Sequence, residues 1–268
     1  MKKRTLLLPV GCILIVMTTA LALSASLIWP SAPGTDMKQD NRLTVDASNS
    51  SDGYIMVKGD YEDKSYKLRI EHNGTVMTYD LNNSGMYEVF PLQFGSGSYK
   101  VSLYVQSEGK KYASAGTTNL SAVLSREDAA FLLPSQYVNY SETSGAVSLS
   151  DSICEGLNGS KEKYEAIRSY VTAHFSYDYI RSLSVSASTM PNIDDCVSNQ
   201  MGISQDLAAM TACMLRVQGI PTRYVIGYLG KQYHAWNLVM IDGQEIIYDP
   251  TADLGGVFGS EYQMERYY

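Results

Sequence analysis

The sequence predicts an α+β protein in which a small antiparallel β-sandwich precedes a domain of helices followed by antiparallel strands. From Arg42 to about Leu124 apolar residues recur with a period of two, which is the spacing of half-buried strands. Between 160 and 219 the apolar spacing becomes helical, and three more strand patterns follow, at 222–229, 233–241 and 245–249. We therefore divide the chain into a leader (1–30), a linker (31–41), a sandwich (42–124) and a C-terminal domain (125–268).

Residues 1–30 have the pattern of an export signal or an N-terminal membrane anchor. Lys2, Lys3 and Arg4 precede an uncharged run that extends from Thr5 to Trp29. A spanning helix needs about 20 apolar residues, more than a cleaved signal, so the length favours a retained anchor. Small residues from 20 to 25 leave cleavage open as the alternative. In both cases we expect the rest of the chain to be extracellular, either secreted or anchored to the outer face of the cell membrane.

The charge balance argues against a nucleic-acid partner. The chain has 21 Lys and Arg against 28 Asp and Glu, which gives a formal net charge of -7. Phosphate binding requires clustered cations, and the leader already contains three of those present.

The predicted sandwich consists of short strands separated by turns. Tyr66, Leu68 and Ile70 alternate with polar residues, and the Asn73-Gly74 pair predicts a tight hairpin turn after them. Short strands with turns between them are typical of a small Ig-like sandwich. Because no chemical constellation occurs in this region, we interpret it as a docking or spacer module.

Three polar residues stand at joints between the predicted elements of the C-terminal domain. Ser204 opens a helix, His234 lies near the start of the middle strand, and Asp249 ends the last strand. A cysteine hydrolase or acyl transferase places its nucleophile at a helix N-terminus, where the helix dipole favours an anion. It also needs an imidazole to accept the proton and a carboxylate to orient the ring. This order predicts a catalytic constellation of Ser204, His234 and Asp249.

The residues around these positions resemble the transglutaminase-like superfamily. The matching segments are Gly202 to Ala209 (GISQDLAA), Leu215-Arg216, Gly219 to Arg223 (GIPTR), His234 to Trp236 (HAW) and Tyr248 to Thr251 (YDPT). They occur in the family's order and approximate spacing and cover roughly Ser160 to Asp253. The preceding strand domain is similar to modules that accompany this domain in some exported bacterial proteins.

The resemblance implies a papain-like fold and acyl transfer at a glutamine or peptide carbonyl, to a lysine amine or to water, without a cofactor. It implies that His234 and Asp249 are the catalytic partners and that Gln205, Tyr233 and Trp236 line the substrate cleft. A protein or peptide is then the expected partner, together with the membrane if the leader is not cleaved. We expect no metal site, because no pair of His or Cys has metal-ligand spacing.

The sequence departs from the family at the nucleophile, because Ser204 stands where the family has its catalytic Cys. A thiol can be ionised by a histidine and a helix dipole, whereas a hydroxyl must lose its proton during the attack itself. Ser204 therefore has a structural interpretation as a helix N-cap, which contributes about 0.5–2 kcal/mol over alanine. Cys196, eight positions earlier, is a displaced alternative, but its segment has no helix-start pattern. Cys213 is predicted to be a core residue, and His72 and His174 are predicted to lie at the surface.

Three functional hypotheses follow from these residues. The first is an inactive or very weak transglutaminase-like pseudoenzyme that acts as an extracellular protein-binding module. The second is an active acyl transferase or protease-like enzyme, with Ser204 as nucleophile or with the serine introduced by engineering in place of Cys. The third is a purely structural surface protein. The ordered motifs make the third the least favoured. The serine at position 204 favours the first, with the second as its alternative.

Overall fold

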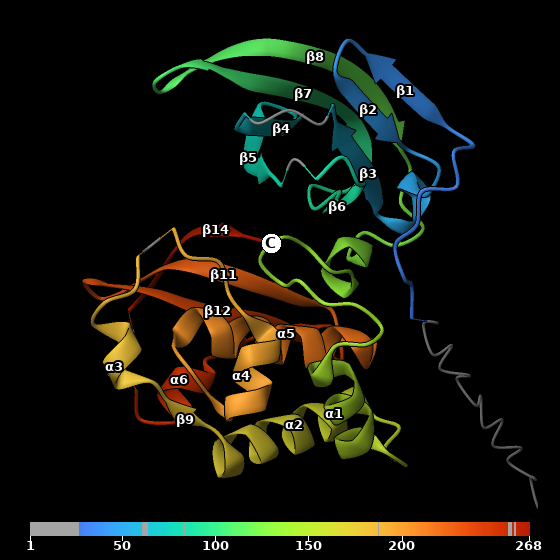
Figure 1. Ribbon diagram of the computed structural model, residues 1–268. Helices are drawn as coiled ribbons and strands as arrows, with labels where there is room; N and C mark the ends of the chain where they lie inside the picture. Colours follow the sequence, from blue (N-terminus) through green and yellow to red (C-terminus); the bar gives the residue numbers. More distant parts are fainter. Residues whose placement is uncertain (1–26, 61–63, 83, 187, 257–258, 260) are drawn as a thin grey trace, which may run out of the picture.

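The computed structural model describes residues 27–268, apart from 61–63, 83, 187, 257–258 and 260 (Figure 1). The predicted leader therefore falls almost entirely outside the described residues. Among the residues that are described, no helix is long and apolar enough to cross a membrane.

The N-terminal half consists of two four-stranded antiparallel sheets. One sheet has the order β1-β2-β3-β6 and the other the order β5-β4-β7-β8. The strands of the first sheet are β1 (Met37–Asp40), β2 (Leu43–Asp46), β3 (Tyr54–Gly59) and β6 (Glu88–Pro91). Those of the second are β4 (Tyr66–His72), β5 (Thr75–Leu81), β7 (Gly97–Glu108) and β8 (Lys111–Ala122). In β4 the alternating residues Tyr66, Leu68 and Ile70 are buried, as their spacing predicts.

The predicted hairpin is confirmed, and the segment predicted as a linker contains a short strand, while its boundaries stay a prediction. Asn73 and Gly74 adopt φ of 47° and 82° and join β4 to β5, because both residues tolerate this left-handed backbone. Strand β1 lies inside the segment 31–41 and pairs with β2 from Met37↔Asp46 to Asp40↔Leu43. Its sequence, MKQD, is mostly polar and exposed, so apolar alternation could not reveal it.

The C-terminal half places helices on one face of a third antiparallel sheet. The sheet has the order β13-β12-β11-β14, with β11 (Thr222–Leu229), β12 (Gln232–Ile241), β13 (Gln244–Tyr248) and β14 (Tyr262–Tyr267). The helices are α1 (Gly145–Cys154), α2 (Ser160–His174), α3 (Tyr179–Ser182), α4 (Ile193–Asn199), α5 (Ser204–Val217) and α6 (Pro250–Asp253). A short parallel pair, β9 (Ser176–Tyr177) with β10 (Met201–Gly202), lies just before α5.

Helix α5 is the central element of this half (Figure 1). Every residue from Asp206 to Val217 is buried, and the helix packs against α1, α2, α4, β11 and β12. Asn237 of β12 fixes the packing, since its amide Nδ2 donates to the Ala208 carbonyl at 3.0 Å and to Thr211 Oγ1 at 2.8 Å. The first residue of α5, Ser204, is thereby held at the edge of a rigid core.

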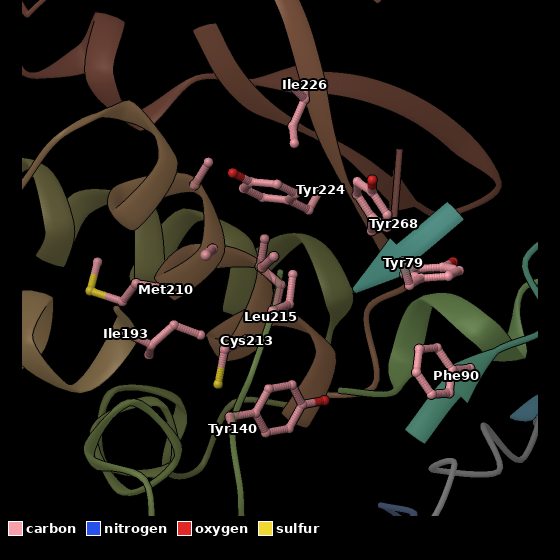
Figure 2. Packing of buried hydrophobic residues seen from close by; sticks show 14 of the residues in the cluster. Tyr79, Phe90, Tyr140, Ile193, Met210, Cys213, Leu215, Tyr224, Ile226 and Tyr268 are labelled. Carbon is pink, nitrogen blue, oxygen red and sulfur yellow. The ribbon is translucent and has the colours of Figure 1, made fainter. Parts of the chain in front are cut away.

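The strands of the two halves share no sheet among the described residues, yet their cores are continuous. A single cluster of buried apolar side chains includes Tyr79 and Phe90 of the sandwich together with Met210, Leu215 and Tyr224 of the C-terminal half (Figure 2). The ring of Tyr268 lies between them, 5.9 Å from the Tyr79 ring and 4.0 Å from the Tyr137 ring. The 3-10 turns η1 (Ser50–Asp52) and η2 (Ala129–Leu132) complete the described elements.

Candidate active site

Asp249 and His234 form a buried pair at the ends of neighbouring strands. His234 lies on β12 and Asp249 directly follows β13, which pairs with β12. The distance between His234 Nε2 and Asp249 Oδ2 is 2.7 Å, and the two side chains are 0% and 2% exposed. A buried ring and carboxylate at hydrogen-bond distance orient each other, so the sequence motifs do bring these two residues together.

Both oxygens of Asp249 are engaged. Oδ1 caps α6 by accepting the backbone N–H of Thr251 at 2.9 Å and of Ala252 at 3.2 Å. Oδ2 accepts from the hydroxyl of Tyr262 on β14 at 2.9 Å as well as from the histidine ring. An ionised carboxylate can only accept hydrogen bonds, so the proton of a neutral His234 ring lies on Nε2. The other nitrogen, Nδ1, then carries a free lone pair.

That lone pair has no partner among the described residues. His234 Nδ1 is buried and makes no hydrogen bond. An unpaired buried nitrogen costs free energy, and active sites are one place where such a cost persists. We expect this arrangement to be able to act as a general base held in one tautomer and one orientation.

Aromatic side chains surround the pair. Trp236 is two residues along β12 and its ring lies 6.1 Å from that of His234, at 19° between the planes. The Tyr262 ring lies 5.1 Å from that of Trp236. Gly227 is the register partner of His234, and a Cβ at this position would meet the Gln263 carbonyl oxygen at 2.0 Å. The absence of a side chain at Gly227 thus allows β14 to approach β11 beside the histidine.

Ser204 is the first residue of α5, and its hydroxyl forms no hydrogen bond within the described part of the chain. The helix N-terminus is capped instead by Asp206, whose Oδ2 accepts the Ile203 backbone N–H at 3.1 Å. The interpretation of Ser204 as a helix N-cap is therefore wrong. The physical reason is that Ile203 occupies the N-cap position, so that Ser204 is already the first residue inside the helix. The approach of Ser204 to His234 within about 4 Å stays a prediction.

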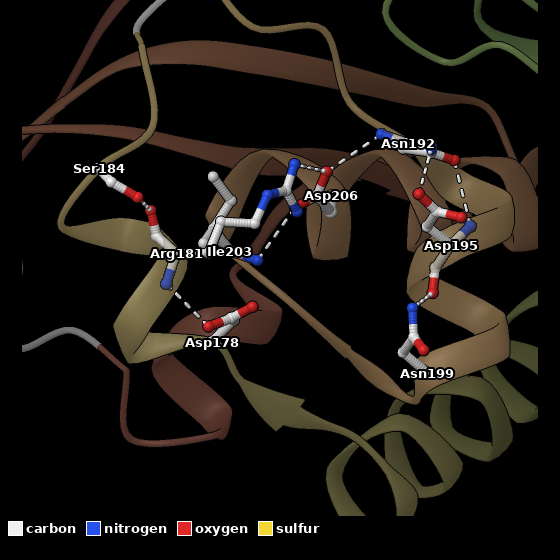
Figure 3. A network of polar contacts seen from close by, with 8 residues as sticks. All are labelled: Asp178, Arg181, Ser184, Asn192, Asp195, Asn199, Ile203 and Asp206. Atoms are coloured by element: carbon white, nitrogen blue, oxygen red, sulfur yellow. Dashed lines mark hydrogen bonds and ion pairs between the residues drawn. The ribbon is translucent and has the colours of Figure 1, made fainter.

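A polar network beside Ser204 holds the start of α5 in place (Figure 3). Asp206 is fully buried and pairs with Arg181 of α3, with Nη1–Oδ2 at 2.5 Å. Its Oδ1 also accepts the Asn192 backbone N–H at 3.0 Å. The carboxylate thus joins both ends of the segment from 181 to 192 to the helix that begins at Ser204.

The residues expected to line the cleft differ in exposure. Trp236 is 2% exposed, whereas Tyr233 and Gln205 are half-buried. The Tyr233 hydroxyl accepts from Arg266 Nη2 at 3.0 Å, and Gln205 Nε2 is buried without a partner among the described residues. This unpaired amide belongs to the residue that directly follows Ser204. Their role as cleft residues stays a prediction.

Cys154, Cys196 and Cys213, the cysteines within the described residues, are free and buried. Burial raises the pKa of the Cys196 and Cys213 thiols and, to a smaller extent, that of Cys154. Cys196 lies in α4, which Asn192 caps by accepting the Asp195 N–H at 3.1 Å, so the expectation of no helix start there was wrong. A buried thiol with a raised pKa is a poor nucleophile, which argues against Cys196 as a displaced catalytic residue.

Two further expectations concern histidines and metals. His72 is 7% exposed and hydrogen-bonded to the Ser98 carbonyl and the Asn73 amide, so its predicted surface position is wrong. His174 is exposed, as predicted. Within the described part of the chain, no group of three or more His, Cys, Asp or Glu could hold a metal ion.

Residues 147–250 match the Transglutaminase-like superfamily. The C-terminal half therefore has a transglutaminase-like core. Its mixed helices and antiparallel sheet, with strand sheets preceding them, agree with the fold class that the sequence predicted.

Similar solved structures include two bacterial proteins. One is a candidate cysteine protease from Cytophaga hutchinsonii, with 19% identity and a TM-score of 0.39 over 74% of this chain and 66% of that one. Another is the periplasmic domain of TgpA from Pseudomonas aeruginosa, with 15% identity and a TM-score of 0.39 over 72% of this chain and 88% of that one. No curated protein matches the chain.

Proposed function

We propose that this chain is an extracellular or membrane-anchored transglutaminase-like protein that binds a protein or peptide and has little or no acyl-transfer activity. The observation that supports the proposal is that residue 204 is a serine whose hydroxyl is not hydrogen-bonded to a base. A serine nucleophile must pass its proton to a base during attack. Within the described part of the chain, however, the Ser204 hydroxyl forms no hydrogen bond, and His234 Nδ1 has no hydrogen-bond partner. The leader pattern at 1–30 supports the location.

The alternative is an active enzyme, and the hydrogen bonds that link His234, Asp249 and Tyr262 support it. These bonds fix the orientation of the His234 ring and leave its Nδ1 atom free to accept a proton. With a thiolate at position 204, sulfur would attack the carbonyl carbon of a glutamine side chain. His234 would protonate the leaving nitrogen, ammonia would depart, and a lysine amine or water would then displace sulfur from the thioester. With serine, the same step requires deprotonation of an alcohol.

The Ser204→Cys variant tests both candidates. We expect the native chain to incorporate no fluorescent primary amine into a glutamine-containing protein, and Ser204→Cys to be alkylated by iodoacetamide at position 204. Alkylation there should be at least about tenfold faster than at Cys154, Cys196 or Cys213, because burial raises the pKa of those thiols whereas a helix N-terminus lowers that of a cysteine. Peptide mapping by mass spectrometry measures all four rates in one sample.

Two control variants make the result decisive. Replacement His234→Ala in the Ser204→Cys background should slow alkylation at 204 without changing the other three cysteines. Amine incorporation by the native chain that Ser204→Ala abolishes would establish a serine enzyme and end the pseudoenzyme proposal. A Cys at position 204 that reacts no faster than the buried cysteines would exclude the enzyme alternative.

A further inference from the structure

A groove of about 790 Å³ lies between the two halves of the molecule, and none of the candidate catalytic residues lines it. One wall is formed by β5 and β6 of the sandwich, and the other by the segments 134–142 and 188–191. Figure 1 shows β5 and β6 at the end of the sandwich that faces the C-terminal half. The proposed function leaves this groove unused.

Both strands that line the groove are the last strands of their sheets. β5 ends the order β5-β4-β7-β8, and β6 ends the order β1-β2-β3-β6. A terminal strand presents backbone N–H and C=O groups that no neighbouring strand satisfies. Such an edge is the surface to which an extended peptide adds as a further strand.

The register of the β4–β5 hairpin shows which backbone N–H and C=O groups of β5 point away from β4. His72 and Thr75 close the two-residue turn, and the hydrogen-bonded pairs of such a hairpin then recur at every second residue. Thr78 therefore directs its N–H and C=O away from β4, as does Asp80. In agreement, the Asp80 carbonyl accepts from Gln136 Nε2 at 2.5 Å, from the opposite wall. Within the described part of the chain, the corresponding groups of exposed Thr78 make no hydrogen bond.

The groove is lined by acidic side chains, which favour an occupant with basic side chains. Asp80, Glu88 and Glu142 line it, and no lysine or arginine is among its lining residues. Asp80 pairs with Lys67 at 2.5 Å. Among the described residues, no cation pairs with Glu88 or Glu142.

Tyrosine rings are the second feature of the lining. Tyr79, Tyr87, Tyr137 and Tyr140 all contribute to it, and Lys58 Nζ already lies 4.8 Å from the centre of the Tyr87 ring. Carboxylates beside tyrosine rings attract lysine and arginine side chains through charge and through cation–π contacts.

One wall of the groove is joined to the start of α5. Ser188, Met190 and Pro191 form part of this wall, and the next residue, Asn192, donates its backbone N–H to Asp206 Oδ1 at 3.0 Å.

We propose that the groove binds an extended, lysine- or arginine-rich segment of a partner protein, which adds as a strand to the free edge of β5. Backbone hydrogen bonds at Thr78 supply the alignment, and Glu88 and Glu142 receive the cationic side chains. This site names the kind of partner for the proposed binding function, but it depends on no property of Ser204. A binding measurement can therefore fail while the acyl-transfer experiments succeed, or the reverse.

Fluorescence anisotropy with three labelled ten-residue peptides tests the proposal. The probes alternate lysine with threonine, glutamate with threonine, and lysine with proline. We expect the lysine–threonine peptide to bind. The glutamate–threonine peptide should not bind, and the lysine–proline peptide should bind at least about tenfold more weakly because it lacks half of the N–H groups that a strand must donate.

Three variants of the protein locate the binding. Glu142→Lys reverses an exposed groove charge and should weaken binding of the lysine–threonine peptide about tenfold. Thr78→Pro removes the outward N–H from an edge strand without changing the charge, and should have a similar effect. Glu155→Lys is the matched control, since it makes the same charge change at an exposed residue outside the groove. Circular dichroism shows whether each variant is folded.

Several results would overturn the proposal. These are no binding of the lysine–threonine peptide, equal loss in Glu155→Lys and Glu142→Lys, and unchanged binding in a folded Thr78→Pro variant. A native dimer in size-exclusion chromatography that Glu142→Lys dissociates would also overturn it, because the occupant would then be a second copy of the chain.

Discussion

Asp249 contacts a helix N-terminus through one carboxylate oxygen and the His234 ring through the other. Its Oδ1 begins α6 by capping Thr251 and Ala252, whereas its Oδ2 faces His234 and Tyr262. The two functions cannot be separated by replacing Asp249 itself, because an Asp249 variant loses the helix cap as well. Tyr262 is the residue that separates them, since it contacts only the oxygen that faces His234.

We predict that Tyr262→Phe weakens the orientation of the ring more than it weakens the fold. The hydroxyl is lost while the ring that packs against Trp236 remains. The free energy of unfolding should fall by about 1 kcal/mol, the usual net value of one hydrogen bond. In the Ser204→Cys background, alkylation at position 204 should slow by roughly threefold or more, with its pH dependence shifted. An unchanged rate and pH profile would show that Tyr262 is structural.

The sequence reveals His234 and Asp249 but not Tyr262. The first two are embedded in short motifs whose order along the chain is informative. Tyr262 follows the Gly255–Gly256 turn in a segment without apolar periodicity, so nothing in its neighbourhood marks it. Its position depends on β14 pairing with β11, a contact between residues far apart in sequence. The acid at Asp206 was visible in the first helical turn, but its partner Arg181 was not.

At the scale of elements, the segment between α3 and α4 is fixed at both ends to α5. Arg181 belongs to α3, Asn192 caps α4, and both bond to the buried carboxylate of Asp206. Leu183, the first residue of this segment, is 90% exposed, whereas Val185 packs against the hydrophobic core. The polar contacts at both ends therefore act together with the packing of Val185 to hold the segment against the start of α5.

We predict that Arg181→Ala releases this segment while the fold persists. Amide hydrogen exchange at 183–186 and 188–192 should become about tenfold faster, which corresponds to about 1.4 kcal/mol of local opening. The matched control is Arg168→Ala, which removes the Arg168–Asp253 pair between α2 and α6. That variant should leave exchange at these residues unchanged. Equal exchange in native and Arg181→Ala proteins would show that the segment is held by other contacts.

Apolar periodicity predicted the elements that bury one face and missed those that do not. Helix α2 buries Tyr164, Ile167 and Val171, and this face was evident from the spacing. Helix α4 buries only Ile193 and Cys196, and strand β1 buries none of its residues, so neither has a pattern. For α4 the start signal was present, with an Asn before the helix and two acids in its first turn.

The whole molecule is held together across the junction of its halves by contacts that sequence patterns cannot reveal. Gln93 of the sandwich side donates to the Tyr267 carbonyl at 2.9 Å, and the Tyr268 ring contacts rings from both halves. The sequence predicted separate packing of the sandwich because its period differs from that of the helices. The spacing of apolar residues indicates the local secondary structure. It does not indicate which face of the sandwich packs against which face of the C-terminal half, and the shared core depends on that packing. The division into domains at 124 therefore stays a prediction.

Arg216 is a buried residue at this junction and the basis of the last prediction. Its side chain donates to the carbonyls of Thr222, Leu133 and Tyr268, at 2.9, 2.5 and 2.7 Å. It is 1% exposed, and burial lowers its pKa to about 10, so the guanidinium is charged at neutral pH. These bonds join α5 to β11, to the segment that leads from the sandwich, and to the end of β14.

We predict that Arg216→Met lowers the free energy of unfolding by about 3 kcal/mol or more, because three buried carbonyls lose their donor. Urea unfolding should still be a single transition, with coincident curves from circular dichroism and tryptophan fluorescence, because the continuous core couples the halves. Arg126→Met is the control, since Arg126 is exposed and pairs only with Asp128, so it should change stability by about 1 kcal/mol or less. Two separate transitions in the native protein would show that the halves unfold independently, and that Arg216 stabilises the C-terminal half alone.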